Sequence, residues 1–169
     1  MNGDVTPDRR MVHVWAIRGI LVHLGMWLLW VLLGLAAATT FAGLGLLLAL
    51  VLATLLMTVA VVTSYGWAFL FWSFYRWRLE PEQIHIWRGI LFRRRITIPY
   101  ARIQNVNVVR SPLLLLFGIS GVEIETAGQK GIYRGITSTE GFLPGVPEGE
   151  RVADAIIERA KRPGATPGL

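Results

Sequence analysis

Charged side chains are missing from one long stretch of this sequence, and cysteine is missing from all of it. Residues 19–75 contain no Asp, Glu, Lys or Arg, and arginines stand at both borders, Arg18 before and Arg76 after. A small soluble domain cannot bury such a run, because as a helix it would extend about 85 Å at roughly 1.5 Å per residue. A bilayer core is about 30 Å thick and needs about 20 apolar residues per crossing. The run therefore predicts two membrane crossings, over about residues 15–38 and 44–73, joined by a tight turn.

The charges beside the two spans predict which side of the membrane holds the rest of the chain. The turn near residues 39–45 carries no charge, whereas arginines precede the first span and follow the second. Positively charged flanks face the cytoplasm, and two crossings leave both ends on one side. We therefore expect a multi-pass protein of the cytoplasmic membrane with both termini inside. Its predicted parts are a tail at 1–13, a helical hairpin at 14–74, a cytoplasmic domain at 75–162 and a disordered tail at 163–169.

A cleaved signal peptide is the competing interpretation of the N-terminus. A basic start precedes an apolar stretch, and Ala36-Ala37-Ala38 resembles a cleavage site. The apolar stretch from Gly19 to Leu35 is longer than the apolar region of a signal peptide, which usually has about 7 to 15 residues, and this favours the hairpin. After cleavage, the second span would remain as an anchor.

Small residues recur at every fourth position of the second span, which allows two helix backbones to approach closely. They form two stripes: Gly45, Ala49, Ala53 and, after a shift, Ala60, Ser64, Ala68. The partner helix lies either in the same chain or in a second copy, so a homo-oligomer stays open. His23 is the one group in the spans that titrates near neutral pH, and no carboxylate accompanies it to complete a proton relay.

The apolar pattern changes its period after the second span. Apolar and polar residues alternate over 83–87, 95–98, 105–108 and 122–125, which is typical of half-buried strands. A weaker strand is expected around Tyr133 and Ile136. Residues 147–161 instead place apolar side chains at helical spacing, with acidic residues first and basic residues last. The sequence therefore predicts several antiparallel strands followed by one amphipathic helix.

Five segments of this region, together with the hairpin, resemble a known family. They are Gly89–Arg95, Ile98–Val106, Ser111-Pro112-Leu113, Phe117-Gly118 and Thr126-Ala127-Gly128. In order and spacing they are similar to the bacterial PH-domain membrane proteins of the YdbS-like type, which carry two N-terminal transmembrane helices and one PH-like domain. The resemblance implies a membrane α+β protein, in which the hairpin is followed by a PH-like curved β-barrel with a C-terminal capping helix. It also implies a membrane complex, with a larger relative carrying several PH-like domains as a partner.

The positions that match the family motif best have expected structural roles. Pro99 ends a strand, and Gly118 and Gly128 adopt turn conformations with positive φ. Gln104 and Asn105 either satisfy backbone groups at a bend or belong to a contact surface. The full set of motif residues is Pro99, Ile103, Gln104, Asn105, Ser111, Pro112, Gly118, Thr126 and Gly128.

Arginines concentrate directly after the second span. Eight lie between Arg76 and Arg110, opposed there only by Glu80 and Glu82. Each could contribute about 1 kcal/mol of attraction to anionic headgroups if it is held near the membrane. They either orient the domain only or bind headgroups, and strand alternation would send Arg94 to the face opposite its two neighbours. The candidate headgroup residues are Arg76, Arg78, Arg93, Arg94 and Arg95.

Two features depart from relatives. The acidic turn Glu80-Pro81-Glu82 occupies the place where eukaryotic PH domains often carry basic residues, which disfavours a phosphoinositide-type pocket. Relatives have polar residues where this chain has an apolar run after Pro112, a residue that can start a short helix. One such turn cannot hide every side chain, so we expect Leu114 and Leu115 to be exposed to a partner protein or to the membrane, unless the run packs on its own chain. The candidate contact residues are Leu113, Leu114, Leu115, Leu116 and Phe117.

No set of residues forms a recognisable catalytic or metal site. His13 and His85 lack metal-ligand partners at usable spacing, and the serines have no nucleophile-elbow context. No nucleic-acid-binding motif accompanies the arginines. We therefore expect no enzyme, cofactor, metal or nucleic-acid partner. The predicted function is a non-catalytic interaction module in a membrane complex, with a sensor of anionic lipid headgroups as the alternative.

Overall fold

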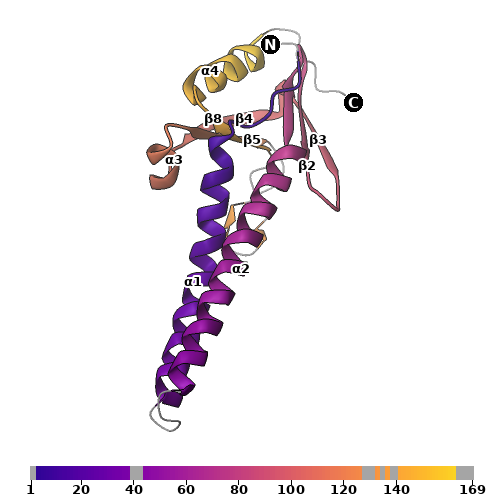
Figure 1. The fold of residues 1–169 in the computed structure, drawn as a ribbon. Coiled ribbons are helices and arrows are strands. Elements are labelled where there is room, and N and C mark those ends of the chain that lie inside the picture. The colour runs from indigo at the N-terminus through magenta and orange to yellow at the C-terminus, as the bar shows by residue number, and fades with distance from the viewer. Residues whose placement is uncertain (1–2, 39–43, 127–131, 134–135, 138–140, 163–169) are drawn as a thin grey trace. The chain divides into compact units, whose positions relative to one another are not determined.

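The computed structural model describes residues 3–38, 44–126, 132–133, 136–137 and 141–162 (Figure 1). The chain forms two compact units. Residues Val12–Phe69 make one unit, and Met1–Met11 join Leu70–Leu169 in the other. Most of the residues expected to be a tail, 1–11 of the predicted 1–13, therefore belong to the same unit as the strands. The predicted tail at 163–169 and most of the predicted hairpin turn lie outside the described residues.

Two long helices make up most of the first unit. They are α1 (Arg10–Ala38) and α2 (Leu44–Phe74). Each is long and apolar enough to cross a membrane. Small residues bring the two helices close at three places. A Cβ added at Gly34 would meet Ala49, and one added at Gly19 would meet Ser64. Between them, Trp27 donates from Nε1 to the Ala53 carbonyl. The small-residue stripe is therefore used for packing within the chain. His23 donates from Nδ1 to the Gly19 carbonyl of its own helix, 2.7 Å away.

The described strands form two three-stranded antiparallel sheets and one short hairpin. The first sheet contains β1 (Arg76–Leu79), β2 (Gln83–Arg88) and β3 (Arg94–Pro99), in that order. The second contains β4 (Ile103–Val109), β5 (Ser120–Thr126) and β8 (Gly141–Val146). The hairpin pairs β6 (Ile132–Tyr133) with β7 (Ile136–Thr137). The alternating runs of the sequence thus became strands, as predicted.

The expected curved β-barrel is not closed in the described part of the chain, because its strands form separate sheets. Pro99 ends β3, as predicted, and it has no N–H with which to continue a ladder. The 3-10 turn η1 (Tyr100–Arg102) then redirects the chain. The next strand, β4, pairs with β5 instead of returning to β3.

The core of the second unit lies between the two sheets and α4 (Gly149–Ala160), the predicted amphipathic helix. Ile86 and Ile124 from the two sheets and Ile156 from α4 are fully buried. The sheets approach closely at Gly141, where a Cβ would lie 2.6 Å from Ile98 Cδ1. The helix α4, yellow in Figure 1, lies over β4 and β5.

Hydrogen bonds fasten the N-terminal residues to this unit. Val5 pairs with Trp77 of β1 in an isolated antiparallel bridge. Trp72, in the last turns of α2, donates from Nε1 to the Pro7 carbonyl at 2.7 Å. The residues just before α1 and the end of α2 therefore lie next to each other.

We expect Ile156→Ala to lower the free energy of unfolding of the strand-containing unit by about 2–5 kcal/mol, because it opens a cavity in a well-packed core. Thermal unfolding of the detergent-purified chain, followed by tryptophan fluorescence, measures the loss. Asp154→Ala is the control on the same helix, since Asp154 is exposed and should change stability by less than about 0.5 kcal/mol. Equal melting temperatures for the two variants would contradict the assignment of Ile156 to the core.

Candidate functional site

Trp87 organises the face of the β1–β2–β3 sheet that points away from the core. Ile86 points inward and is fully buried, so its neighbour Trp87 points outward. The guanidinium carbons of Arg78 on β1 and Arg95 on β3 each lie 5.7 Å from the centre of the Trp87 ring. A guanidinium within about 6 Å of an indole face is attracted by the ring quadrupole. The indole therefore holds an arginine from each neighbouring strand.

A polar network centred on His85 lies one row farther along the same face. His85 is only 2% exposed, and its Nδ1 lies 2.9 Å from Thr97 Oγ1. Its Nε2 lies 3.0 Å from Gln83 Nε2 and 3.2 Å from the Glu80 carboxylate. The same carboxylate lies 3.7 Å from an Arg78 nitrogen. Because buried polar groups need partners, this network gives His85 a structural role beneath the arginines.

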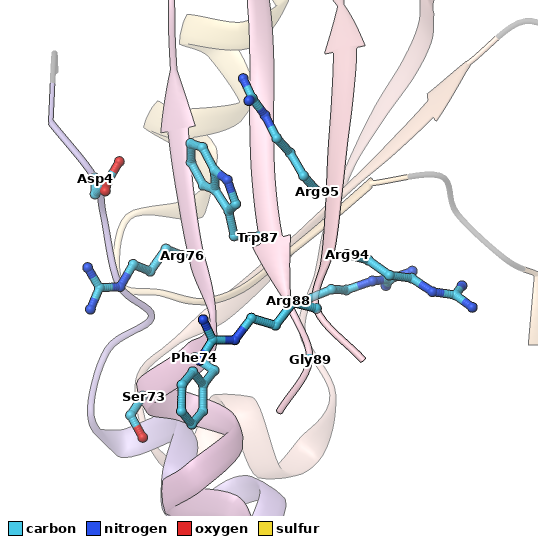
Figure 2. A pocket seen from close by; sticks show the side chains of 10 residues that line it. Asp4, Ser73, Phe74, Arg76, Trp87, Arg88, Gly89, Arg94 and Arg95 are labelled. Carbon is cyan, nitrogen blue, oxygen red and sulfur yellow. The ribbon is translucent and has the colours of Figure 1, made fainter. Parts of the chain in front are cut away.

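A pocket of about 440 Å³ opens at the end of this sheet, beside the last turn of α2. Figure 2 shows the side chains around it, with Arg95 alongside Trp87 and with Phe74 at the helix end. Five arginines and five other residues line the pocket: Arg76, Arg88, Arg93, Arg94, Arg95, Asp4, Ser73, Phe74, Trp87 and Gly89. The chain thus gathers positive charge from two strands, one loop and the start of a third strand.

The positive charge of this arginine pocket is largely uncompensated. Of the described residues that line it, only Asp4 is acidic, and Asp4 pairs with Arg78 at 2.6 Å. Among the described residues, no carboxylate forms a salt bridge with any of the five lining arginines. Arg93 instead stacks over the Phe74 ring at 5.1 Å. Such a pocket attracts anions, and guanidinium groups bind phosphate or carboxylate through paired hydrogen bonds.

The loop between β2 and β3 brings these arginines together. Gly89 has φ of +106°, and a Cβ there would lie 2.1 Å from the Phe92 carbonyl oxygen, so only glycine fits this turn. The register pairs Arg88 with Arg94. Sequence alternation placed Arg94 opposite Arg93 and Arg95, but Arg93 lies in the loop before β3, and all three reach the pocket.

Sequence reasoning missed part of the pocket and included a residue that does not line it. Arg88 was not among the candidates, although the register of a β2–β3 hairpin would have placed it opposite Arg94. No sequence pattern marked Asp4 or Phe74 as pocket residues, because they reach the pocket only through the tertiary structure. Arg78 is held by Asp4 and Trp87 on the sheet face and is not a lining residue.

The apolar run after Pro112 forms α3 (Pro112–Leu116), as predicted, with Ser111 at its N-cap. Leu114 is only 2% exposed, so the expectation that it is exposed is wrong. Its carbonyl accepts the Ile119 N–H, which turns this side of the short helix toward β5. Leu115 and Leu116 are 59% and 75% exposed, whereas Leu113 and Phe117 are half-buried. Arg10 donates to the Phe117 carbonyl at 3.0 Å, so α3 lies beside the start of α1.

The described motif residues of the resemblance have structural surroundings. The pairing of β4 with β5 shifts register between Ile103 and Asn105, which places an irregularity at Gln104. The Asn105 side chain accepts the Val106 N–H at 3.1 Å, which favours a role at this bend. Gly118 has the predicted positive φ, +63°. Thr126 ends β5, and Gly128 lies outside the described residues.

Tyr75 connects α2 to β1 and lies next to the arginine pocket. Its hydroxyl donates to the Phe142 carbonyl. Burial raises the pKa of Tyr75 to about 12, although the neighbouring Arg88 acts to lower it. Tyr75 therefore stays protonated at neutral pH and keeps its hydrogen bond to Phe142 beside the pocket.

We expect Tyr75 to ionise near pH 12 in the folded chain. Its raised pKa favours the folded state below pH of about 10, the unfolded value, and this contribution disappears as pH rises toward the folded value. Ultraviolet titration of phenolate formation should show a late transition that Tyr75→Phe removes. The denatured chain is the control, and a difference between wild type and variant centred at the denatured value would contradict the burial.

Comparison with known proteins agrees with this architecture. The family model described as Bacterial PH domain matches residues 19–160. No curated protein matches the chain, and no solved structure does. The matched range includes most of α1, all of α2, every described strand and α4. The chain therefore belongs to the bacterial PH domain family.

Proposed function

We propose that this protein is a membrane-anchored, non-catalytic PH-like module that binds anionic lipid headgroups in its arginine pocket. The observation that carries the proposal is the set of five arginines around one pocket, none in a salt bridge with a described carboxylate. Membership of the bacterial PH domain family supports a non-catalytic interaction role.

Membrane anchoring is proposed from the two apolar helices and the charges at their ends. Both helices have the length and composition of membrane spans. The contact between Trp72 and Pro7 supports an arrangement with both helix ends on one side. The flanking arginines support a cytoplasmic location for that side. This arrangement is the one the YdbS-like resemblance implies.

The location of the pocket favours a lipid headgroup over a soluble anion. Ser73 and Phe74 in the last turn of α2 line it, so it would lie at the membrane surface when α2 spans the bilayer. Charges within a Debye length of anionic lipids are attracted to them. The volume of about 440 Å³ is within the range of small-molecule sites.

We expect the triple variant Arg93→Ala, Arg94→Ala, Arg95→Ala to bind dihexanoyl phosphatidylglycerol up to about 100-fold more weakly than wild type at low salt. Each arginine near a headgroup contributes about 1 kcal/mol, and each loss of 1.4 kcal/mol is tenfold. Calorimetric titration of the full chain in mild detergent measures the affinity. Dihexanoyl phosphatidylcholine is the neutral-lipid comparison.

The matched control removes three exposed arginines elsewhere: Arg110→Ala, Arg151→Ala and Arg162→Ala. It changes the net charge equally and should leave phosphatidylglycerol binding nearly unchanged. If both triple variants lose the same affinity, the attraction is a general charge effect and the pocket is not the site.

Docking of a second membrane protein is the other candidate function, supported by the exposed Leu115 and Leu116 on α3. Two neighbouring exposed leucines beside the start of α1 present an apolar patch that a partner could cover. A larger membrane protein with several PH-like domains is the partner that the resemblance implies.

We expect Leu115→Gln combined with Leu116→Arg to abolish copurification of such a partner from native membranes in mild detergent. Mass spectrometry should identify a stoichiometric membrane protein with wild type and with the control Ala101→Arg, an exposed position on η1. A partner retained by the double variant, or no partner with wild type, would rule out this docking site.

A further inference from the structure

The loop between β2 and β3 exposes two large apolar side chains. Leu91 is 81% exposed and Phe92 is 83% exposed, more than any other large hydrophobic residue that the structure describes. The loop turns at Gly89, whose positive φ brings its backbone against the Phe92 carbonyl. Water contact with such a pair is unfavourable, so their exposure indicates a contact that covers them.

The strand pairing places this loop next to the end of α2. β1 begins two residues after α2 ends, and Arg76 at its start pairs with Trp87 near the end of β2. The β2–β3 loop therefore leaves the sheet at the end where α2 finishes. Stacking of Arg93 on Phe74 gives independent support for this position.

Positive charge surrounds the apolar pair. Arg88 precedes the loop, Arg93 is its last residue, and Arg94 follows it at the start of β3. The loop carries apolar side chains at its tip and arginines at its base. A membrane interface has the same order of layers, with apolar acyl chains below anionic phosphates. A protein partner would need an apolar recess ringed by acidic groups, whereas the bilayer adjoining a membrane-spanning α2 supplies both layers.

We infer that Leu91 and Phe92 insert into the bilayer interface beside α2 while Arg88, Arg93 and Arg94 contact lipid phosphates above them. The inference rests on the proposed membrane function and adds a second, apolar contact to it. Insertion would hold the arginine pocket at the level of the lipid phosphates, so the loop sets the depth of the headgroup site in the membrane interface.

Single-cysteine probes test this insertion, because the chain has no cysteine of its own. Leu91→Cys carries a bimane label at the loop, and Ala101→Cys carries it on η1, an exposed position after the far end of β3. Each full chain is reconstituted in vesicles of phosphatidylcholine, with and without phosphatidylglycerol. Nitroxide groups on the acyl chains of added lipids quench bimane only when it lies within the bilayer.

We expect a blue-shifted emission and strong quenching by acyl-chain nitroxides for the label at position 91, and neither for the label at 101. Adding Phe92→Asp to Leu91→Cys should remove the quenching, because a carboxylate would have to enter the apolar layer. An unquenched label at 91 would overturn the inference. So would a blue shift without lipid quenching, since that pattern means that a protein covers the loop.

The lipid arms separate this inference from the proposed function. If the label at 91 is quenched equally in neutral and anionic vesicles, insertion is supported. That result stands even if the arginine variants contradict the proposed selective binding of phosphatidylglycerol. Selective phosphatidylglycerol binding with an unquenched label at 91 retains the headgroup site and overturns insertion.

Discussion

The short connection at Tyr75 is the constraint on which the rest of this structure depends. α2 ends at Phe74 and β1 begins at Arg76, so one buried residue joins the apolar helix to the first sheet. Because β2 pairs antiparallel with β1, and β3 with β2, in a defined register, this connection determines which end of the sheet lies beside the end of the helix at Phe74. The arginine pocket and the apolar loop both lie at that end.

Uncompensated arginines need another source of order, and aromatic rings provide it here. Trp87 holds Arg95, and Phe74 holds Arg93, without neutralising their charge. A carboxylate partner would order a guanidinium equally well but would compete with an anionic ligand for it. The cation–π contacts thus keep the charge available for the anion binding that we propose.

Much of the architecture could be predicted because it depends on local patterns. Alternation around Ile84 and Ile86 predicted β2, Pro112 predicted α3, and helical spacing around Ile156 predicted α4. Predictions that depended on contacts between distant segments of the chain were less successful. Leu114 is covered because α3 turns that side toward β5, and no one-turn pattern reveals which leucine faces inward. The separate sheets follow from where β4 finds its partner, which local alternation does not specify.

The amino-acid sequence by itself determined two long apolar helices, short alternating strands, a terminal amphipathic helix and a concentration of arginine after the second helix. These features follow from periodicity and charge, which act over a few neighbouring residues. Only the tertiary structure decided that Arg88 and Asp4 join the pocket, that Arg78 stays outside it, and that Leu91 and Phe92 remain uncovered beside α2. Those outcomes depend on strand register and on contacts between distant segments, because the position of a charge relative to other charges is a property of the folded chain.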